Sequence, residues 1–296
     1  MATDIEKLRR SFEVGGHSLR EVQRDASDEG GHIVERLIFE TGYGEAVRGL
    51  LARPKSGAPS PAILYIHAHG ARHDIGAAEL LDGRPALKEP LGPVFAAMGF
   101  ATLAIDMPGF GSRSGRSESE LAKARLWLGQ SLAGQMLGEQ TAALSWLAVQ
   151  PFVDARRIGC FGISMGATLG YWLAAVDNRV ATLAHLCCYA DFATLIELGA
   201  HDLHGIYLTI PGLLNIASNG EIAGLIAPRP QLICIGNLDP LTPPVAVDRA
   251  LAQTRAAYEQ AGAADRLLVH READTGHQES PEMRRAVLDF FRRNLD

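Results

Sequence analysis

Six short runs along the chain are apolar at most positions, and most are bounded by glycine, proline or charged residues. They cover residues 61–70, 100–109, 157–162, 179–190, 230–236 and 265–270. A strand with one solvated face would alternate apolar and polar residues, whereas these runs are nearly continuous. The pattern therefore predicts strands that are buried on both faces, as in a parallel sheet.

The segments between these runs carry apolar residues at helical spacing. Helices are expected just before residues 98–99, within 117–149, directly after the third run, and over 244–261 and 280–294. Strands and helices that alternate at this scale favour right-handed crossovers between parallel strands. The sequence thus predicts an α/β fold, with a mostly parallel, twisted sheet and helices on both of its faces.

The N-terminal part has a different pattern. Residues 1–30 are polar and predict a helix followed by a loose strand. Within 32–54, two extended runs flank a Gly-Tyr-Gly turn at 42–44, and Pro54 ends the second run. Two such runs joined by a glycine-containing turn are typical of a β-hairpin.

Residues 191–227 interrupt the alternation, because they separate two expected strands by more than one crossover helix needs. Their apolar residues fall partly at helical spacing, and Pro211-Gly212 breaks the pattern. We expect a helical cap inserted over the carboxyl edge of the sheet, although a longer crossover would give a similar pattern. No linker divides the rest, so one domain is expected over residues 1–296.

Composition excludes several classes of protein. The chain has 296 residues, of which 47% are hydrophobic, and a net charge of −6. With no basic block, nucleic acid is not an expected partner. No apolar run is long enough to span a membrane, and the N-terminus has no apolar core of signal-peptide length, so a cytoplasmic protein without a membrane partner is expected.

Cysteine spacing gives no sign of a metal or redox site. Cys160, Cys187, Cys188 and Cys234 lie within the apolar runs, and no C-x-x-C pair occurs. We interpret them as reduced core residues. No metal and no cofactor are expected.

The strongest chemical signal is a G-x-S-x-G pentapeptide between an expected strand and an expected helix. It consists of Gly162-Ile163-Ser164-Met165-Gly166. At such a strand-to-helix turn the serine is held in a strained conformation, and its hydroxyl is lifted out of the sheet. The helix N-terminus behind it favours developing negative charge. Without that context, the same pattern could be a tight turn with an idle serine.

Three polar residues follow three different strands in the order serine, aspartate, histidine. They are Ser164, Asp239 and His277. A serine hydroxyl becomes a good nucleophile when an imidazole takes its proton and a carboxylate orients that imidazole. Because the carboxyl ends of parallel strands share one sheet edge, the three are candidates for a catalytic triad.

Other acids remain open as the third member of this triad. Asp248 lies early in a helix, Asp265 precedes a strand, and Asp274 is only three residues from His277. Asp239 could also serve merely to start a turn before Pro240.

An oxyanion hole needs two N–H donors near the nucleophile. We expect one from Met165, the residue after the serine, and one from the loop after the first buried strand. In that loop the N–H of His69 is preferred and that of Ala68 comes second. His67 and His69 could instead form an H-x-H metal pair, but no further ligand cluster is evident in the sequence.

These segments together resemble the α/β-hydrolase superfamily, and within it the esterase group around acetyl xylan esterases, dienelactone hydrolase-like proteins and prolyl-oligopeptidase catalytic domains. The matching segments are YIHAHG, GFATLAIDMPGFGSR, VDARRIGCFGISMGATLGYWLAA, IAPRPQLICIGNLDPLTP and DTGHQES, which lie between about residues 61 and 281. The resemblance implies an α/β-hydrolase fold with Ser164 as nucleophile, Asp239 as acid and His277 as base.

The chain departs from that group at several points. Ala68 stands where a glycine usually follows the histidine of the oxyanion loop, and Ala167 stands where a third glycine often follows the elbow. Dienelactone hydrolases proper use cysteine as the nucleophile, so lactone specificity does not carry over to Ser164. No propeller domain is visible, so a prolyl-oligopeptidase gate is not expected.

The expected activity is hydrolysis of a small-molecule carboxylic ester with a small or medium acyl group, through an acyl-enzyme. Amide or peptide hydrolysis and non-catalytic ligand binding are the alternatives. In the expected cap, His201, His204 and Tyr207 are the polar candidates for substrate binding. The apolar surface of the cap leaves a homo-oligomer open, and the loop from Ala71 to Pro90 is a second place for a pocket.

Overall fold

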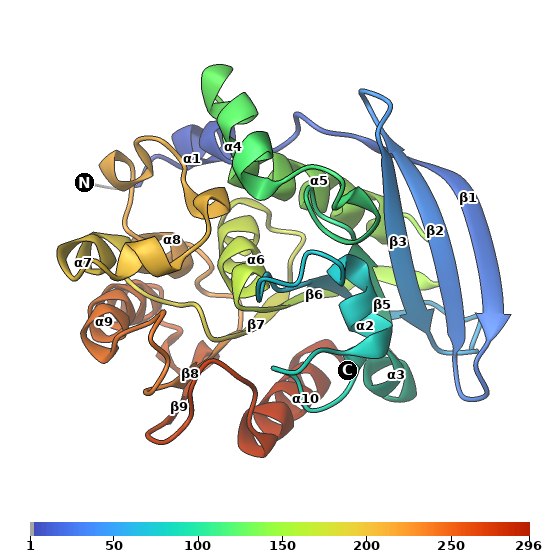
Figure 1. Cartoon of the computed structure of the whole chain (residues 1–296). Coiled ribbons are helices and arrows are strands. Elements are labelled where there is room, and N and C mark those ends of the chain that lie inside the picture. Colours follow the sequence, from blue (N-terminus) through green and yellow to red (C-terminus); the bar gives the residue numbers. More distant parts are fainter. Residues whose placement is uncertain (1–2) are drawn as a thin grey trace.

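The computed structural model describes residues 3–296 and contains a nine-stranded sheet in the order β1-β2-β3-β5-β4-β6-β7-β8-β9 (Figure 1). The strands are β1 (Leu19–Asp28), β2 (Ile33–Thr41), β3 (Ala46–Arg53), β4 (Ser60–Ile66), β5 (Ala101–Ile105), β6 (Val153–Ile163), β7 (Thr182–Leu186), β8 (Gln231–Gly236) and β9 (Leu267–Glu272). From β5 to β9 all neighbours in the sheet are parallel, and β1, β2 and β3 extend it antiparallel. This is the α/β-hydrolase type of sheet that the sequence predicts.

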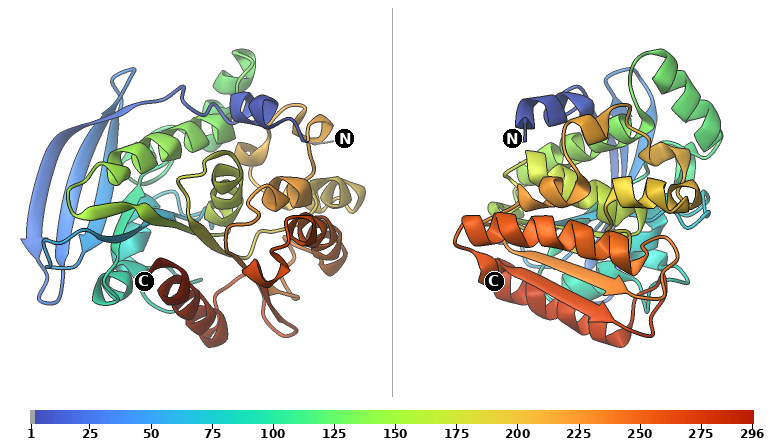
Figure 2. Two further views of the ribbon diagram at one scale, coloured as in Figure 1. Left: turned by 180° about the vertical axis from the view of Figure 1, so that it is seen from behind. Right: turned by 90° about the vertical axis from the view of Figure 1, so that its left-hand side faces the viewer.

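Helices fill most of the connections. The α-helices are α1 (Ile5–Ser11), α2 (Glu79–Asp82), α3 (Leu91–Ala97), α4 (Glu118–Trp127), α5 (Leu132–Ala148), α6 (Met165–Val176), α7 (Phe192–Glu197), α8 (Asn219–Gly224), α9 (Pro244–Gln260) and α10 (Pro281–Leu295). The short 3₁₀ helices are η1 (Gly76–Ala78), η2 (Gly111–Arg113), η3 (Ala200–Leu203), η4 (Ile206–Leu208), η5 (Leu213–Asn215) and η6 (Ala264–Arg266). Figure 2 shows α5 and α6 on one face of the sheet and α10 on the other.

Alternate residues of the parallel strands pack into two separate cores. In β4, Leu64 and Ile66 join the core beneath α5 and α6, while Ile63 and Tyr65 join the core beneath α3 and α10. Successive side chains of a strand point to opposite faces. A strand covered by helices on both sides must therefore be apolar at successive positions, which explains the continuous runs.

Helix α10 shows how local sequence sets an element. Ser280 accepts a hydrogen bond from the N–H of Met283, and Pro281 occupies the first turn, where its missing N–H costs nothing. Met283, Val287 and Phe291 then recur at a spacing of four and pack on the sheet. The prediction of a helix over 280–294 is confirmed.

The long helical stretch expected over 117–149 is two helices. α4 ends at Trp127, and Gly129 adopts a left-handed backbone angle (φ 72°) before Ser131 caps α5. The hairpin expected over 32–54 is formed by β2 and β3. The sequence did not predict η1 and α2, which lie in the polar loop after β4.

Residues 191–227 contain two short α-helices, α7 and α8, with three 3₁₀ helices between them (Figure 1). Gly199 and Gly212 precede η3 and η5 with left-handed backbone angles (φ 72° and 75°), which glycine tolerates best. Each such turn redirects the chain, so this segment forms no continuous crossover helix. Over residues 3–296, no helix is both long and apolar enough to cross a membrane.

Candidate active site

Ser164 lies at a sharp turn between the end of β6 and the start of α6. Its backbone has a positive φ of 58°, an unusual angle for a residue with a side chain. Both flanking glycines are required by close approach: a Cβ on Gly162 would lie 2.1 Å from the carbonyl oxygen of Gly166, and a Cβ on Gly166 would lie 1.9 Å from that of Ile66. The turn is therefore packed directly against the end of β4, where the oxyanion loop begins.

This packing predicts that Gly166→Ala lowers the free energy of unfolding by about 2 to 4 kcal/mol, because the new methyl group meets backbone that cannot move aside. Thermal or urea unfolding measures the effect. The matched control is Gly170→Ala on the same helix, where the new Cβ would lie 3.5 Å from Cys160 and Leu183. Alanine should there leave stability unchanged or raise it by up to about 1 kcal/mol. Equal effects of the two substitutions would contradict the packing argument.

Ser164, His277 and Asp239 form one hydrogen-bonded chain. The serine Oγ lies 2.8 Å from Nε2 of His277, and Nδ1 of the same ring lies 2.6 Å from Oδ2 of Asp239. Oδ1 of Asp239 accepts the N–H of Leu241 at 2.9 Å. Since an ionised carboxylate only accepts hydrogen bonds, the ring donates from Nδ1, and Nε2 is left to accept the serine proton.

The other acids are not placed for this role. Asp248 is exposed and pairs with Arg271, and Asp265 and Asp274 are exposed. Asp239 is 2% exposed and Ser164 is 6% exposed. Asp239 and His277 follow β8 and β9, so three strand ends supply the three side chains.

The loop that carries His277 is clamped by a buried ion pair that sequence analysis missed. Glu279 donates its N–H to the carbonyl of Ala86 (2.8 Å), and its carboxylate accepts from Nε of Arg284 (2.6 Å) and from the N–H of Lys88 (2.9 Å). The Sγ of Cys187 lies within 4.8 Å of a carboxylate oxygen of Asp239 and a ring nitrogen of His277, and burial raises the pKa of this thiol well above the ordinary value. It is thus an uncharged neighbour of the site.

The two candidate donors of the oxyanion loop, the N–H groups of Ala68 and His69, differ in whether the protein already binds them. The N–H of Ala68 is taken by the buried carboxylate of Glu79 at 3.0 Å, which removes the second choice made from the sequence. The N–H of His69 has no acceptor among residues 3–296. Glu79 also accepts a hydrogen bond from the hydroxyl of Tyr65 (2.7 Å) and pairs with Arg84 (2.7 Å). These contacts fix the carboxylate that binds the loop.

His67 is not available as a metal ligand, because the protein occupies both of its ring nitrogens. Nε2 accepts the N–H of Met107 at 3.2 Å, and Nδ1 therefore donates to the carbonyl of Ala68 at 3.0 Å. Burial lowers the pKa of this ring to about 4, so it is neutral. It connects the ends of β4 and β5 and gives no support to an H-x-H metal pair.

An apolar cavity of about 500 Å³ lies within the segment 191–227. Its lining combines aliphatic side chains with a few polar ones: Phe192, Leu195, Ile196, His201, Asp202, His204, Gly205, Ile206, Leu208, Thr209, Ile210, Leu213 and Leu214. Nε2 of His204 reaches the carbonyl of Leu241, whose N–H binds Asp239. The cavity thus borders the loop of the triad carboxylate. Tyr207 does not line it and stacks on His69 instead.

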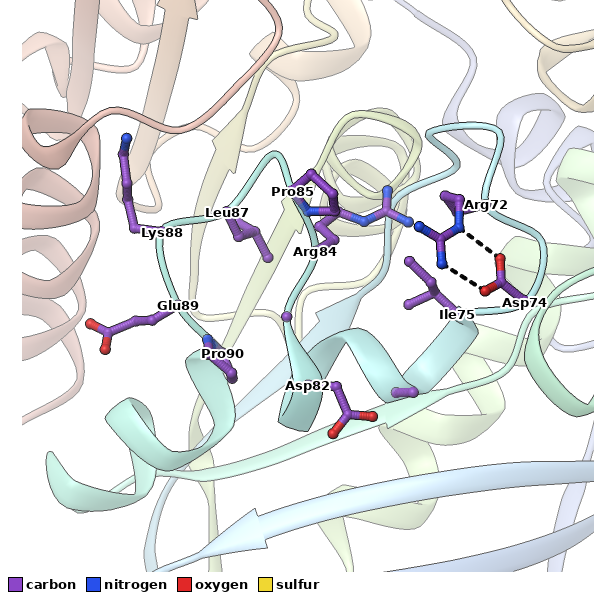
Figure 3. A pocket seen from close by; sticks show the side chains of 12 residues that line it. Arg72, Asp74, Ile75, Asp82, Arg84, Pro85, Leu87, Lys88, Glu89 and Pro90 are labelled. Carbon is purple, nitrogen blue, oxygen red and sulfur yellow. Dashed lines mark hydrogen bonds and ion pairs between the residues drawn. The ribbon is translucent and has the colours of Figure 1, made fainter.

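A second cavity, of about 540 Å³, lies in the loop between Ala71 and Pro90 (Figure 3). Half of its lining residues are charged: Arg72, which pairs with Asp74, and Asp82, Arg84, Lys88 and Glu89. Because these charges balance, the cavity presents no net attraction for an acid or a base. Its apolar residues are interspersed with these charges, so it offers an acyl chain a less continuous apolar lining than the cavity within 191–227.

A mostly parallel sheet with this elbow and this hydrogen-bonded Ser-His-Asp chain at its carboxyl edge defines an α/β-hydrolase of the serine hydrolase class. The chain belongs to the X-Pro dipeptidyl-peptidase (S15) family, whose model matches residues 45–231. A Bacillus subtilis relative, YtaP, which bears a provisional hydrolase name, is 37% identical over 266 residues, 89% of each chain.

Solved structures share the fold over the full length of the chain. Acetyl xylan esterase 1 from Thermoanaerobacterium sp. has a TM-score of 0.67 at 17% identity, and the match covers 100% of this chain and 95% of the esterase chain. The glucuronoyl esterase from Solibacter usitatus has a TM-score of 0.69 at 14% identity, and the match covers 99% of this chain and 92% of the esterase chain. At these identities the likeness establishes the fold.

Proposed function

We propose that this serine hydrolase cleaves carboxylic esters with small or medium acyl groups. The observation that carries the proposal is the continuous hydrogen-bonded chain from Ser164 through His277 to Asp239. It provides a nucleophile, a base and an orienting carboxylate at distances suited to proton transfer.

In the proposed reaction, Ser164 Oγ attacks the ester carbonyl while Nε2 of His277 takes its proton. The N–H groups of Met165 and His69 stabilise the oxyanion of the tetrahedral intermediate. The imidazolium, stabilised by Asp239, then protonates the departing alcohol and leaves an acyl-serine. Water attacks this acyl-enzyme with His277 as the base, and the acid is released.

The apolar cavity, which borders the loop of Asp239 through His204 and Leu241, supports the choice of acyl groups of limited size. Most of its lining side chains are aliphatic, including Leu208 and Leu213, which suits an acyl chain that must leave water. The structural neighbours named above include esterases, which is consistent with ester chemistry although their identity to this chain is low.

Peptide cleavage is the second candidate, because the family model is named for a dipeptidyl-peptidase. Such a substrate brings a free N-terminal ammonium, which needs a carboxylate partner. Asp202 is the one carboxylate among the side chains that line the apolar cavity. A peptidase would therefore depend on Asp202, whereas an esterase would not.

The test compares p-nitrophenyl esters from acetyl to decanoyl with the matching anilides and with an X-Pro p-nitroanilide. We expect turnover of the esters with a peak at short or medium chains. In Leu208→Ala the preferred chain should lengthen, with kcat/KM for the longer ester rising about 10-fold relative to the shorter one. Leu128→Ala, at an exposed leucine directly after the C-terminus of α4 that does not line this cavity, is the control and should not shift the profile.

Preferential cleavage of the X-Pro anilide, lost in Asp202→Asn, would replace the ester proposal with the peptidase one. An unchanged chain-length profile in Leu208→Ala would instead remove the cavity from the acyl site.

A further inference from the structure

The side chain of His69 is held more firmly than an oxyanion loop requires for its backbone alone. Its ring stacks on Tyr207, with centroids 5.1 Å apart and planes at 22°, and meets Phe110 edge-on at 5.2 Å. Nδ1 accepts the N–H of Ala71 at 3.0 Å, and Nε2 makes a short contact with the carboxylate of Glu118. Four groups thus fix one ring in place.

The hydrogen bonds also fix the proton on that ring. Because Nδ1 accepts from a backbone N–H, the neutral imidazole carries its hydrogen on Nε2 and donates it to Glu118. Burial pushes the pKa of Glu118 upward, but the hydrogen bonds from His69 and from the N–H of Tyr207 hold the pKa below its ordinary value. Glu118 is therefore an ionised acceptor at neutral pH.

Glu118 also binds the segment 191–227. Its Oε1 accepts the backbone N–H of Tyr207 at 3.2 Å, while Oε2 faces His69. A Cβ on Gly205 would lie 2.7 Å from the same Oε1, so the carboxylate is pressed against the backbone of that segment. One side chain at the start of α4 therefore joins the oxyanion loop to the segment that lines the apolar cavity.

A metal ion would use these atoms differently. Ring nitrogens of His69 and His73 and a carboxylate oxygen of Glu118 lie within 4.8 Å of one another. Nδ1 of His73 lies 3.0 Å from the carbonyl of Gly109 and, by donating to it, leaves Nε2 free. Either nitrogen of His69, however, could bind a cation only by giving up the Ala71 or the Glu118 hydrogen bond. The geometry favours a hydrogen-bonded cluster.

We propose that Glu118 is a positioning residue of the oxyanion hole. By binding the His69 ring, Glu118 holds the N–H of His69 toward the developing oxyanion. Because Glu118 also binds the N–H of Tyr207, the position of the His69 N–H depends on the position of the segment 191–227. The inference rests on the proposed function. A donor stabilises an oxyanion only at about 2.7–3.1 Å, and removal of one costs about 10²- to 10³-fold in kcat. If Glu118 no longer positions this donor, kcat should therefore fall by a part of that factor.

The test is Glu118→Gln, which keeps the size of the side chain. The carboxylate accepts from Tyr207 at Oε1 and faces His69 with Oε2, whereas the amide has an oxygen at only one of these two positions, and its nitrogen then faces a donor at the other. We expect kcat to fall about 10- to 100-fold with KM changed less than about 3-fold. A boronic acid that forms a tetrahedral adduct with the serine should bind more weakly by the factor by which kcat/KM falls.

Two measurements separate positioning from a merely structural role. Active-site titration with a fluorophosphonate gives the fraction of folded sites, and kcat is expressed per titrated site. Glu120→Gln is the matched control, because Glu120 is exposed on the same helix and its carboxylate pairs, among residues 3–296, with Arg116 alone. An unchanged kcat per site in Glu118→Gln, or a loss confined to KM, would overturn the proposal.

The coupling to the segment 191–227 is tested by Tyr207→Ala alone and combined with Glu118→Gln. If both act through the His69 ring, the double variant should be little slower than the slower single variant. Additive losses would overturn the coupling.

If Glu118→Gln does not fold, His69→Phe keeps the stacking and removes the hydrogen bond, and the same loss of kcat is expected. Failure of the proposed function would appear separately, as activity that survives Ser164→Ala.

Discussion

Replacement of Ser164 by alanine should lower kcat about 10⁴- to 10⁶-fold and abolish labelling by a fluorophosphonate. The reason is that the hydroxyl is the only atom changed, and it is the atom that His277 faces at 2.8 Å. Residual turnover would come from the oxyanion donors and from substrate binding. Because alanine fits the turn as serine does, the melting temperature should change little.

The measurement needs a control for damage to the fold. Ser145→Ala, in the C-terminal part of α5, removes a hydroxyl whose partners in the described part of the chain are the helix carbonyl of Thr141 and Arg179. That variant should keep full activity and full labelling. An Ser164→Ala enzyme with most of its wild-type activity would move the nucleophile elsewhere and remove the basis of the proposed function.

The parts of the fold that sequence alone could predict are those with a periodic signal. Continuous apolarity identified the buried strands, because their alternate residues enter two cores at once, as Leu64 and Tyr65 do in β4. The expected places of Ser164, Asp239 and His277 followed from chain order and strand ends. Each could be predicted because its neighbours in sequence, the elbow glycines or a strand, define its position.

The roles of three acids whose partners are distant in sequence could not be predicted in this way. Glu79, Glu118 and Glu279 each lie in an ordinary polar segment, and their roles come from partners made close by folding, such as Glu118 with His69 at 49 residues' separation. The choice between Ala68 and His69 as oxyanion donor depended on Glu79, which takes the Ala68 N–H. No spacing in the sequence reveals such a contact.

Asp239→Asn should leave the fold intact and lower kcat about 10⁴-fold. The carboxylate accepts two hydrogen bonds, from His277 Nδ1 at 2.6 Å and from the N–H of Leu241 at 2.9 Å, whereas an asparagine has one oxygen. If that oxygen keeps Leu241, the amide donates to Nδ1, and the ring proton moves to Nε2. The histidine then presents a hydrogen to Ser164 and cannot accept one.

The steady-state kinetics of Asp239→Asn are compared with those of two control variants, in which the replaced acid lies outside the hydrogen-bonded chain. Asp248→Asn and Asp274→Asn, both at exposed positions, should change kcat less than about 3-fold. Because the triad acts as one unit, Asp239→Asn added to Ser164→Ala should cause little further loss, although each alone is severe. Full additivity of the two losses, or a larger defect in Asp274→Asn, would assign the orienting carboxylate to another residue.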